Sequence, residues 1–275
     1  MLICGIIAAL FTLLAKKTGL RFLETSGLVK RNYAGKPVPT SAGIILVLAA
    51  SFAVTVTATC FAASKTDPEI SLTGLPLVMG SCFVGFIDDV YGSHDSKGLR
   101  GHLQAFLKER RITTGLQKAV GIWLLAAFTV ILSTEGPRAV FILDATLISL
   151  AANVMNLLDF RPGRSMKAFL VFFACLAPLG RSSSAGPICA GLAGAVLIGL
   201  RDDLAERSMM GDSGANPLGA ALGFWATVSF SLPVRAFLLL SLIGIHVYSE
   251  RNSLSTAISK SPILSFLDGL GRVRK

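Results

Sequence analysis

Two adjacent carboxylates, Asp88 and Asp89, end an apolar stretch that begins near Leu75. Ionised carboxylates at the edge of a bilayer are costly and repel each other, so such a pair indicates a functional site. Carboxylates are also the usual protein ligands of divalent cations, and magnesium takes one or two of them together with substrate phosphates. Neighbouring helical residues point about 100° apart, so the two groups need not share one role. The simpler alternative is a water-facing pair that ends a helix.

A lysine follows a glycine in the segment GKPVPTSAG, residues 35–43. Two prolines force an extended backbone here, and Thr40 or Ser41 can cap a helix that begins near Gly43. Lys36 is thereby placed beside a helix N-terminus, where anions bind well. We predict that Lys36 binds phosphate, and the alternative is an interfacial lysine in a loop before a helix.

A third motif, NVMNLLD, repeats polar residues at every third position: Asn153, Asn156 and Asp159. On a helix these three side chains fall within an arc of about 120°, so they share one face. Amides inside a membrane span need partners, and hydrogen bonding between helices is the alternative to substrate binding. Arg161 and Arg164 follow at once, where they can bind phosphate or simply mark the inner side of the membrane.

The fourth motif is MMGDSGANPLG, residues 209–219. Asp212 or Ser213 can cap a helix that begins near Asn216 and Pro217. The glycines let backbone N–H groups approach an anion or a metal-bound phosphate, although capping alone explains much of the motif. Pairs of helices separate the four motifs, so a helix bundle can bring them together. Their acids together with Lys36 suit a magnesium–diphosphate substrate.

The elements that must position these residues are membrane helices. Apolar residues make up 52% of the 275 residues and charged residues 15%, whereas a soluble domain carries about 25% charge. We predict an all-α, polytopic transmembrane bundle of about nine helices, some shorter than the ~20 residues that a perpendicular span needs. The predicted segments are 1–15, 42–63, 73–90, 118–133, 139–158, 166–180, 186–200, 216–231 and 233–249.

The placement of positive charge predicts the orientation of the bundle. All but four of the 26 lysines and arginines fall on one side when nine helices alternate from an outside N-terminus, which is the positive-inside pattern. This pattern explains the net charge of +10 without nucleic acid. It predicts a cytoplasmic C-terminus and an integral domain, 1–249, whose active-site loops are cytoplasmic. Those loops are 16–41, 88–118, 159–167 and 201–215, and a basic tail, 250–275, follows.

Two further expectations concern smaller features. Segment 97–117 alternates leucines with arginines and lysines at helical spacing, which predicts an amphipathic helix at the membrane surface. The first apolar segment has no convincing cleavage site and is predicted to be an N-terminal anchor. The five cysteines lack metal-binding spacing and lie in or near apolar segments, so packing is their expected role.

The four motifs, in this order and on one side, resemble those of the polyprenyl-phosphate N-acetylhexosamine-1-phosphate transferases. This superfamily includes the phospho-N-acetylmuramoyl-pentapeptide transferase and the GlcNAc-1-phosphate transferases, of glycosyltransferase 4 type. The resemblance covers roughly residues 30–220 and places this chain on a divergent branch. It implies a cell-membrane enzyme of glycan synthesis, dependent on magnesium or manganese. Such an enzyme moves a sugar-1-phosphate from a UDP-sugar to polyprenyl phosphate, typically undecaprenyl phosphate, and releases UMP. A homodimer is compatible with the resemblance.

The resemblance also implies roles for single residues. Asp88 and Asp89 match the aspartate pair of the family, and Asp212 matches the metal-binding aspartate of its MGD motif. Lys36 matches the lysine of the nucleotide- and phosphate-binding loop. The matches to the asparagine–aspartate run are Asn153, Asn156 and Asp159. We therefore expect Asp88, Asp89 and Asp212 to be catalytic, with metal held by Asp212 and Asp88, and the remaining motif residues, with Arg161 and Arg164, to bind substrate.

This chain departs from the family in three places. Pro162 replaces the second aspartate of the asparagine–aspartate run, where the family builds its nucleotide pocket. The histidine-rich cytoplasmic loop is replaced by HVYSERNSLSTAISK, with His246 expected to remain in a helix. The last helix of the family is expected to be absent, so that the chain ends inside.

Two other classes of function compete with the enzyme. A catalytically degenerate member would bind lipid phosphate or nucleotide sugar and act as a scaffold or regulator of envelope synthesis; the lost aspartate and histidines favour it. A transporter would use buried acids to couple ions, but its acids would lie near the middle of the membrane. The acids here gather at one face, which favours the transferase.

Overall fold

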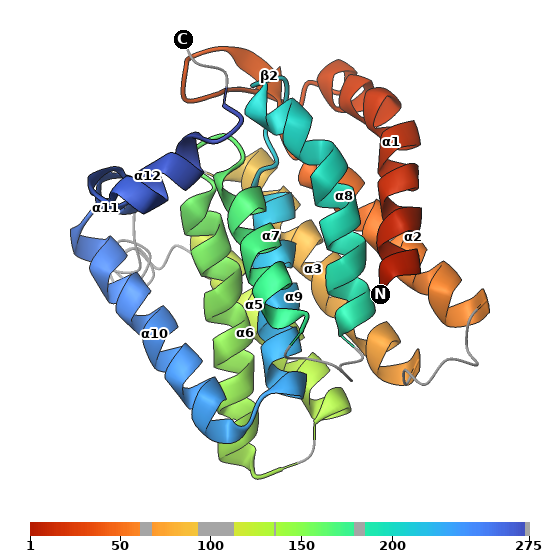
Figure 1. The fold of residues 1–275 in the computed structure, drawn as a ribbon, viewed down its shortest axis with the longest axis vertical. Helices are drawn as coiled ribbons and strands as arrows, with labels where there is room; N and C mark the ends of the chain where they lie inside the picture. The colour runs from red at the N-terminus through yellow and green to blue at the C-terminus, as the bar shows by residue number, and fades with distance from the viewer. Residues whose placement is uncertain (61–67, 93–112, 135, 179–184, 273–275) are drawn as a thin grey trace.

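The computed structural model describes residues 1–60, 68–92, 113–134, 136–178 and 185–272. Helices dominate these ranges and stand side by side as a bundle (Figure 1). The first part of the chain comprises α1 (Leu2–Thr25), β1 (Val29–Arg31), β2 (Pro37–Pro39), α2 (Gly43–Cys60), α3 (Pro68–Tyr91) and α5 (Thr114–Ser133). The second part comprises α6 (Arg138–Leu158), α7 (Arg164–Leu176), α8 (Gly186–Leu204), α9 (Asp212–Ser229), α10 (Leu232–Arg251), α11 (Leu254–Lys260) and α12 (Pro262–Gly269).

The predicted all-α membrane bundle is confirmed at this level. Among the described residues, 6 helices are long and apolar enough to cross a membrane: α1, α2, α3 from Leu72, α5, α6 and α10. The other three predicted segments form helices that differ from such spans for clear reasons. Helix α7 has only 13 residues, α8 ends in the charged run 201–203, and α9 is rich in glycine and alanine.

Helix α9 is the central helix of the bundle, and every residue from Ser213 to Thr227 is buried. Small residues let its neighbours approach closely, as is common where membrane helices pack. A Cβ atom on Gly219 would overlap the backbone of Ala151 in α6, and one on Gly223 would lie 2.8 Å from the Ile148 Cα atom. Helix α9 is therefore fixed in place by close packing against α6.

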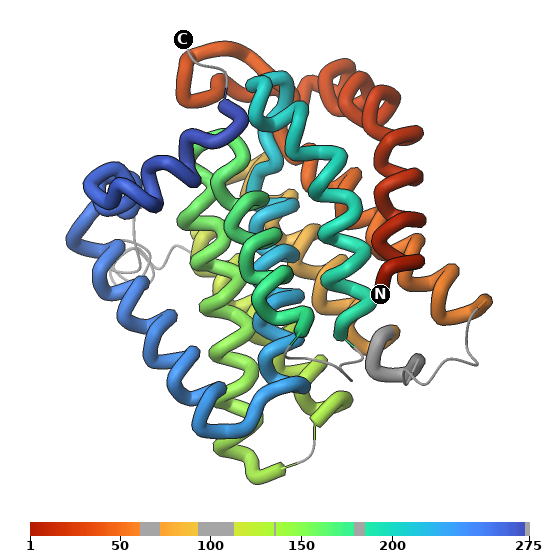
Figure 2. The backbone as a smooth tube through the Cα atoms, in the orientation of Figure 1, coloured from red at the N-terminus to blue at the C-terminus, as the bar shows by residue number. Residues whose placement is uncertain are grey.

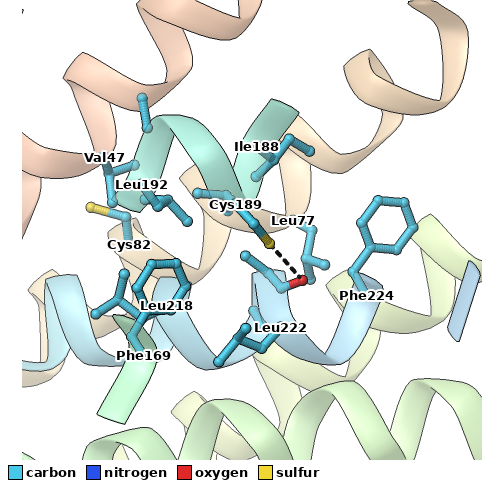
Figure 3. Packing of buried hydrophobic residues seen from close by; sticks show 14 of the residues in the cluster. Val47, Leu77, Cys82, Phe169, Ile188, Cys189, Leu192, Leu218, Leu222 and Phe224 are labelled. Atoms are coloured by element: carbon cyan, nitrogen blue, oxygen red, sulfur yellow. Dashed lines mark hydrogen bonds between the residues drawn. The ribbon is translucent and has the colours of Figure 1, made fainter. Parts of the chain in front are cut away.

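Side chains from helices throughout the bundle fill the core around α9, and Figure 3 shows part of this packing. Phe224 and Leu218 of α9 lie among Leu77 of α3 and Leu192 of α8, and all four are almost completely buried. The Cys189 thiol donates to the Ala221 carbonyl oxygen at 3.5 Å. Cys4, Cys82 and Cys189 are buried within this core and free of disulfides, so packing is the role that the structure gives them.

A small hairpin connects α1 to α2 and is fastened to the loop before α9. Gly27, at φ +76°, follows the end of α1, and Val29 pairs with Pro39 across the two strands. The Met209 N–H donates to the Pro39 carbonyl at 2.8 Å, and the Gly43 N–H donates to the Met210 carbonyl at 2.9 Å. The chain before α2 and the chain before α9 are thus held side by side.

Helix α10 lies at the edge of the bundle, crossing the outside of α6 (Figure 2). None of its residues is buried. Two polar contacts hold it against α6: an ion pair between Arg235 and the fully buried Asp144, and a contact of 2.8 Å between the Asn153 amide nitrogen and His246 Nε2. The expectation that His246 lies in a helix is confirmed.

Two remaining expectations concern the surface helix predicted at 97–117 and the basic tail. Most of the surface helix predicted at 97–117 lies outside the described residues; at its end Thr113 caps α5, accepting from the Leu116 N–H at 3.2 Å. The basic tail contains the short helices α11 and α12.

Candidate active site

One ammonium group joins two of the predicted aspartates. Lys118 lies in the second turn of α5, and its Nζ donates to Asp88 Oδ2 at 2.8 Å, near the end of α3. The same Nζ also contacts Asp212 Oδ2, on the first residue of α9. The side chains of Lys118, Asp88 and Asp212 are 13%, 18% and 21% exposed, so the group is mostly buried but not closed off. Three helices that are distant in sequence therefore place opposite charges together.

Asn156 completes this cluster from α6. Its nitrogen is assigned toward Asp212 Oδ1 at 2.6 Å and its oxygen toward Lys118 Nζ at 2.9 Å, because the opposite orientation would set donor against donor and acceptor against acceptor. We name Asp88, Lys118, Asn156 and Asp212 the lysine–aspartate cluster. All three motif residues in it were expected to bind metal or substrate, and the structure brings them together.

Asp89 lies beneath this cluster and caps α9 from a different helix. Its Oδ1 accepts from the Asp212 N–H at 2.9 Å, and its Oδ2 accepts from the Ser213 N–H at 3.1 Å and the Ser41 hydroxyl at 2.9 Å. The expectation that Asp212 or Ser213 caps a later helix is wrong, because α9 already begins at Asp212 and Gly211 is its N-cap residue. A carboxylate from α3 satisfies the free N–H groups instead, so the side chain of Asp212 stays available to Lys118.

Glycines make this convergence of helix ends possible. Gly85 of α3 and Gly43 of α2 both touch the first turn of α9, where any Cβ atom would overlap the Asp212 or Gly214 backbone. Gly211 has φ +72°, and a Cβ atom there would lie 2.5 Å from Asp89 Oδ2. The backbone, rather than side-chain packing, therefore sets the spacing between the carboxylates.

Two further acids, Asp159 and Asp203, lie at the loop that follows α6. Asp203 of α8 accepts from the Gly163 N–H at 2.5 Å and from the Met210 N–H at 3.1 Å, so it ties this loop to the loop before α9. Asp159 follows α6 directly. Burial raises the pKa of Asp159 well above its usual value, and the charges of Asp203, Asp212 and Asp89 raise it further. Burial and the neighbouring acids therefore favour the neutral form of Asp159.

Replacing Asp159 by asparagine should stabilise the protein near neutral pH. A carboxyl whose pKa is raised on folding lowers the free energy of unfolding as pH rises above the unfolded pKa of about 4. Asparagine carries no charge, so position 159 should no longer lower the free energy of unfolding as pH rises. Thermal unfolding between about pH 5 and 8 should show the melting temperature of the wild type falling more steeply than that of Asp159→Asn; parallel slopes would contradict this assignment.

The other predicted site residues lie away from the lysine–aspartate cluster. The Lys36 side chain is 58% exposed, and its Nζ lies 3.7 Å from Glu206 Oε2. The Arg161 guanidinium lies over the Tyr33 ring, 5.0 Å from its centroid. Asn153 contacts His246 in α10, and Arg164 contacts the C-terminal segment through Asp268. Asn153 and Asn156 thus use different partners, although both belong to one polar repeat.

The lysine–aspartate cluster offers two carboxylates, Asp88 and Asp212, to a divalent cation. In the described part of the chain, no three histidine, cysteine, aspartate or glutamate side chains converge as a metal site. Asp88 and Asp212 do converge on one cation, the Lys118 ammonium. Two carboxylates are as many as magnesium usually takes from a protein when substrate phosphates supply other ligands. The residues therefore fit magnesium bound together with a phosphate ligand.

Two functional candidates were not expected from the sequence. Lys118 stands at the start of an apolar segment, where a lysine is also explained by the positive-inside pattern. What distinguishes it is its place one helical turn inside α5, where an ionisable group needs a partner, and the apolar segment read from the sequence begins only at Lys118. Asp203 was counted only within a cytoplasmic loop, and a buried carboxylate that accepts two loop N–H groups leaves no sequence pattern.

Comparison with known proteins adds no family assignment: no protein-family model matches the chain, and no curated protein matches it either.

Proposed function

We propose that this protein is a membrane phosphoglycosyltransferase that moves a sugar-1-phosphate from a UDP-sugar to polyprenyl phosphate, with release of UMP, in cell-envelope glycan synthesis. The observation that carries the proposal is the Lys118 ammonium shared by Asp88 and Asp212. Ammonium groups and carboxylate-bound cations are the groups that stabilise charge on a transferring phosphoryl unit. Their position at the ends of membrane helices suits a reaction between a lipid and a soluble nucleotide.

Asp88 and Asp212 would hold magnesium with the diphosphate. When bound, the metal would offset charge on the diphosphate oxygens. Lys118 would donate to the same oxygens by exchanging one of its present acceptors on Asp88, Asp212 and Asn156 for the substrate. Asn156 fixes the Asp212 carboxylate through its amide nitrogen, and Asp89 positions the helix that carries Asp212. We assign Asp89 a positioning role on this basis.

The reaction needs no strong base. A phosphate monoester has a second pKa of about 6, so the acceptor lipid phosphate is largely ionised at neutral pH. Its oxygen attacks the phosphorus nearest the sugar and forms a new P–O bond. The bond from that phosphorus to the bridging oxygen breaks, and UMP leaves with the electron pair. The products are polyprenyl diphosphate sugar and UMP, so charge stabilisation and positioning are what the protein must supply.

The proposal includes an orientation. The lysine–aspartate cluster lies at the end of the bundle where α3 and α6 end and α5 and α9 begin. Among the described residues, the loops at this end contain Lys30, Arg31, Lys36, Arg161 and Arg207, which supports a position on the cytoplasmic side of the cell membrane. We further propose that α7, α8 and α9 cross the membrane together with the 6 candidate spans, which gives nine membrane helices, an outside N-terminus and an inside C-terminus. A cytoplasmic site has direct access to UDP-sugars.

The direct test is release of UMP by purified protein. Magnesium, undecaprenyl phosphate and a panel of UDP-sugars are supplied, and wild type, Asp212→Asn and Asp202→Asn are compared. Asp202 is a buried acid near the same end that pairs with Lys16 at 2.7 Å, outside the lysine–aspartate cluster. Wild type and Asp202→Asn should release UMP, and Asp212→Asn should lose activity by about 10²-fold or more. Absence of release with every sugar would reject the enzyme.

A catalytically degenerate binding protein is the second candidate. One observation favours it: the Lys118 ammonium already lies between Asp88 and Asp212, so the two acids share a cation of the protein itself. Such a protein would bind polyprenyl phosphate or a UDP-sugar and regulate envelope synthesis. It would bind one of these ligands in equilibrium dialysis while releasing no UMP.

A further inference from the structure

The C-terminal segment returns to the bundle and lies against the loop that follows α6. We name residues 254–272, which comprise α11, α12 and the three residues after them, the C-terminal arm. Figure 1 shows α12 beside the start of α7, and Figure 2 shows the chain end passing over the turn between α6 and α7. The arm and this loop are about a hundred residues apart in sequence, so their contact is a tertiary feature of this chain.

Arg164 carries the central contact. Its Nε donates to Asp268 Oδ1 at 2.8 Å, and one terminal nitrogen donates to Asp268 Oδ2 at 3.0 Å, which makes the pair bidentate. The other terminal nitrogen donates to the Ser255 hydroxyl at 2.8 Å. Arg164 is only 7% exposed. Bidentate arginine–carboxylate pairs fix orientation as well as distance, so both helices of the arm are held by one guanidinium.

Two further cations extend the contact. Lys167 Nζ donates to the carbonyl oxygens of Leu267, Asp268 and Leu270, at 2.9, 2.7 and 3.0 Å, and so satisfies the carbonyls at the end of α12. Arg272 donates to Asp268 Oδ1 at 2.5 Å and, through Nε, to the Pro162 carbonyl oxygen at 3.1 Å. The last contact reaches the loop backbone itself.

The loop from Asp159 to Gly163 is thereby held from two sides. Asp203 accepts from the Gly163 N–H on one side, and Arg272 donates to Pro162 on the other. The Cβ position of Gly271 lies 3.0 Å from the Leu204 side chain, so the arm also touches the end of α8. The loop joins Asn156, in the last turn of α6, to α7, and the arm can therefore set the conformation of a segment adjacent to the lysine–aspartate cluster.

Ionic contacts, rather than apolar burial, must hold the arm. No residue of α11 or α12 is buried, and α10, which leads to them, buries none either. Burial acts to raise the pKa of Asp268, but the hydrogen bonds from Arg164 and the charges of Arg164, Arg272 and Lys167 outweigh it and lower that pKa. Asp268 thus remains ionised and bound to the arginines over the physiological range.

We propose that the C-terminal arm positions the loop Asp159–Gly163 for nucleotide binding, with Asp268 as the positioning residue that clamps Arg164 and Arg272. The nucleotide part of this inference rests on the proposed function, whereas the clamp itself does not. It gives Arg164 a role in holding the arm.

The test compares full-length wild type, Asp268→Asn and Lys260→Gln. Asp268→Asn removes the charge that both arginines contact, and Lys260→Gln removes an exposed charge from the same arm as a matched control. Hydrogen–deuterium exchange is measured for peptides covering 159–167. Exchange there should be about tenfold faster in Asp268→Asn and unchanged in Lys260→Gln, since hydrogen bonds to charged groups are the stronger ones. Equilibrium binding of UDP with magnesium is measured in parallel, and its Kd should rise by a similar factor.

Each outcome decides one part of the proposal. Unchanged exchange at 159–167 in Asp268→Asn and in Arg272→Gln would overturn the clamp. Faster exchange with unchanged UDP binding would overturn the nucleotide role. Wild type that binds no UDP would reject the proposed function and the nucleotide role with it, and the exchange result would still decide the clamp. If Asp268→Asn fails to fold, Arg272→Gln supplies the same comparison, since it removes only the contacts to Pro162 and Asp268.

Discussion

Lys118→Gln should reduce UMP release by about 10²- to 10³-fold, because it removes a fixed positive charge from the place where phosphate charge is transferred. The same substitution should destabilise the protein by about 3–5 kcal/mol, since it leaves two partly buried carboxylates without their shared cation. Glutamine is close to lysine in length and keeps a donor, so the missing charge is the main difference. Activity and thermal unfolding together measure both effects.

The effect of magnesium on the melting temperature separates the loss of the Lys118 charge from a general destabilisation of the protein. With Lys118 removed, Asp88 and Asp212 repel each other, and magnesium added to ligand-free protein should raise the melting temperature more in Lys118→Gln than in wild type. Lys16→Gln is the matched control, because Lys16 also pairs with a buried acid, Asp202 at 2.7 Å, but lies outside the cluster. Equal magnesium shifts in all three proteins would argue against a cation site at the two aspartates.

Much of the fold was predictable because apolar length and charge placement constrain membrane helices directly. The sequence pattern predicted the helical bundle and the gathering of the motifs at one end, and the common contact of Asp88 and Asp212 with Lys118 follows that prediction. Helix ends were less predictable. Asp212 was expected to lie before its helix because capping residues usually do, whereas a carboxylate from another helix, Asp89, performs the capping.

Side-chain direction explains why Asn153, Asn156 and Asp159 do not share one set of partners. Asn153 and Asn156 are three residues apart and share a broad face, but they lie about 60° apart around the helix. That difference is enough to turn Asn153 toward α10 and Asn156 toward α9. Asp159 follows the end of α6, so helical spacing does not fix its direction. The docking of the C-terminal arm depends on tertiary contacts of Asp268 and Arg272, which no local pattern predicts.

The lysine–aspartate cluster and the cap of α9 also depend on each other. Asp88 and Asp89 are neighbours, yet one contacts Lys118 and the other accepts backbone N–H groups. Because the two side chains point in different directions from one helix end, α3 fixes both the start of α9 and the cation beside it. A substitution at Asp89 should therefore affect the reaction by displacing Asp212.

Asp89→Ala should lower the free energy of unfolding by about 3 kcal/mol, because it leaves the N-terminus of α9 uncapped and the buried Ser41 hydroxyl without its acceptor. UMP release should fall with it, since Asp212 begins the helix that loses its cap. Asp89→Asn keeps one oxygen as an acceptor and should lose about half as much stability, and Ser41→Ala should lose about 1 kcal/mol. Thermal unfolding and UMP release are measured across this series.

The series distinguishes positioning from direct catalysis. If Asp89 acts by positioning α9, activity should follow stability through Ser41→Ala, Asp89→Asn and Asp89→Ala. Gly211→Ala should join the same trend, because its added Cβ would lie 2.5 Å from Asp89 Oδ2 and displace the capping carboxylate. An Asp89→Asn protein as stable as wild type but inactive would instead give Asp89 a direct part in the reaction. If a destabilised Asp89→Ala protein retained its activity, the cap of α9 would not be needed for the reaction.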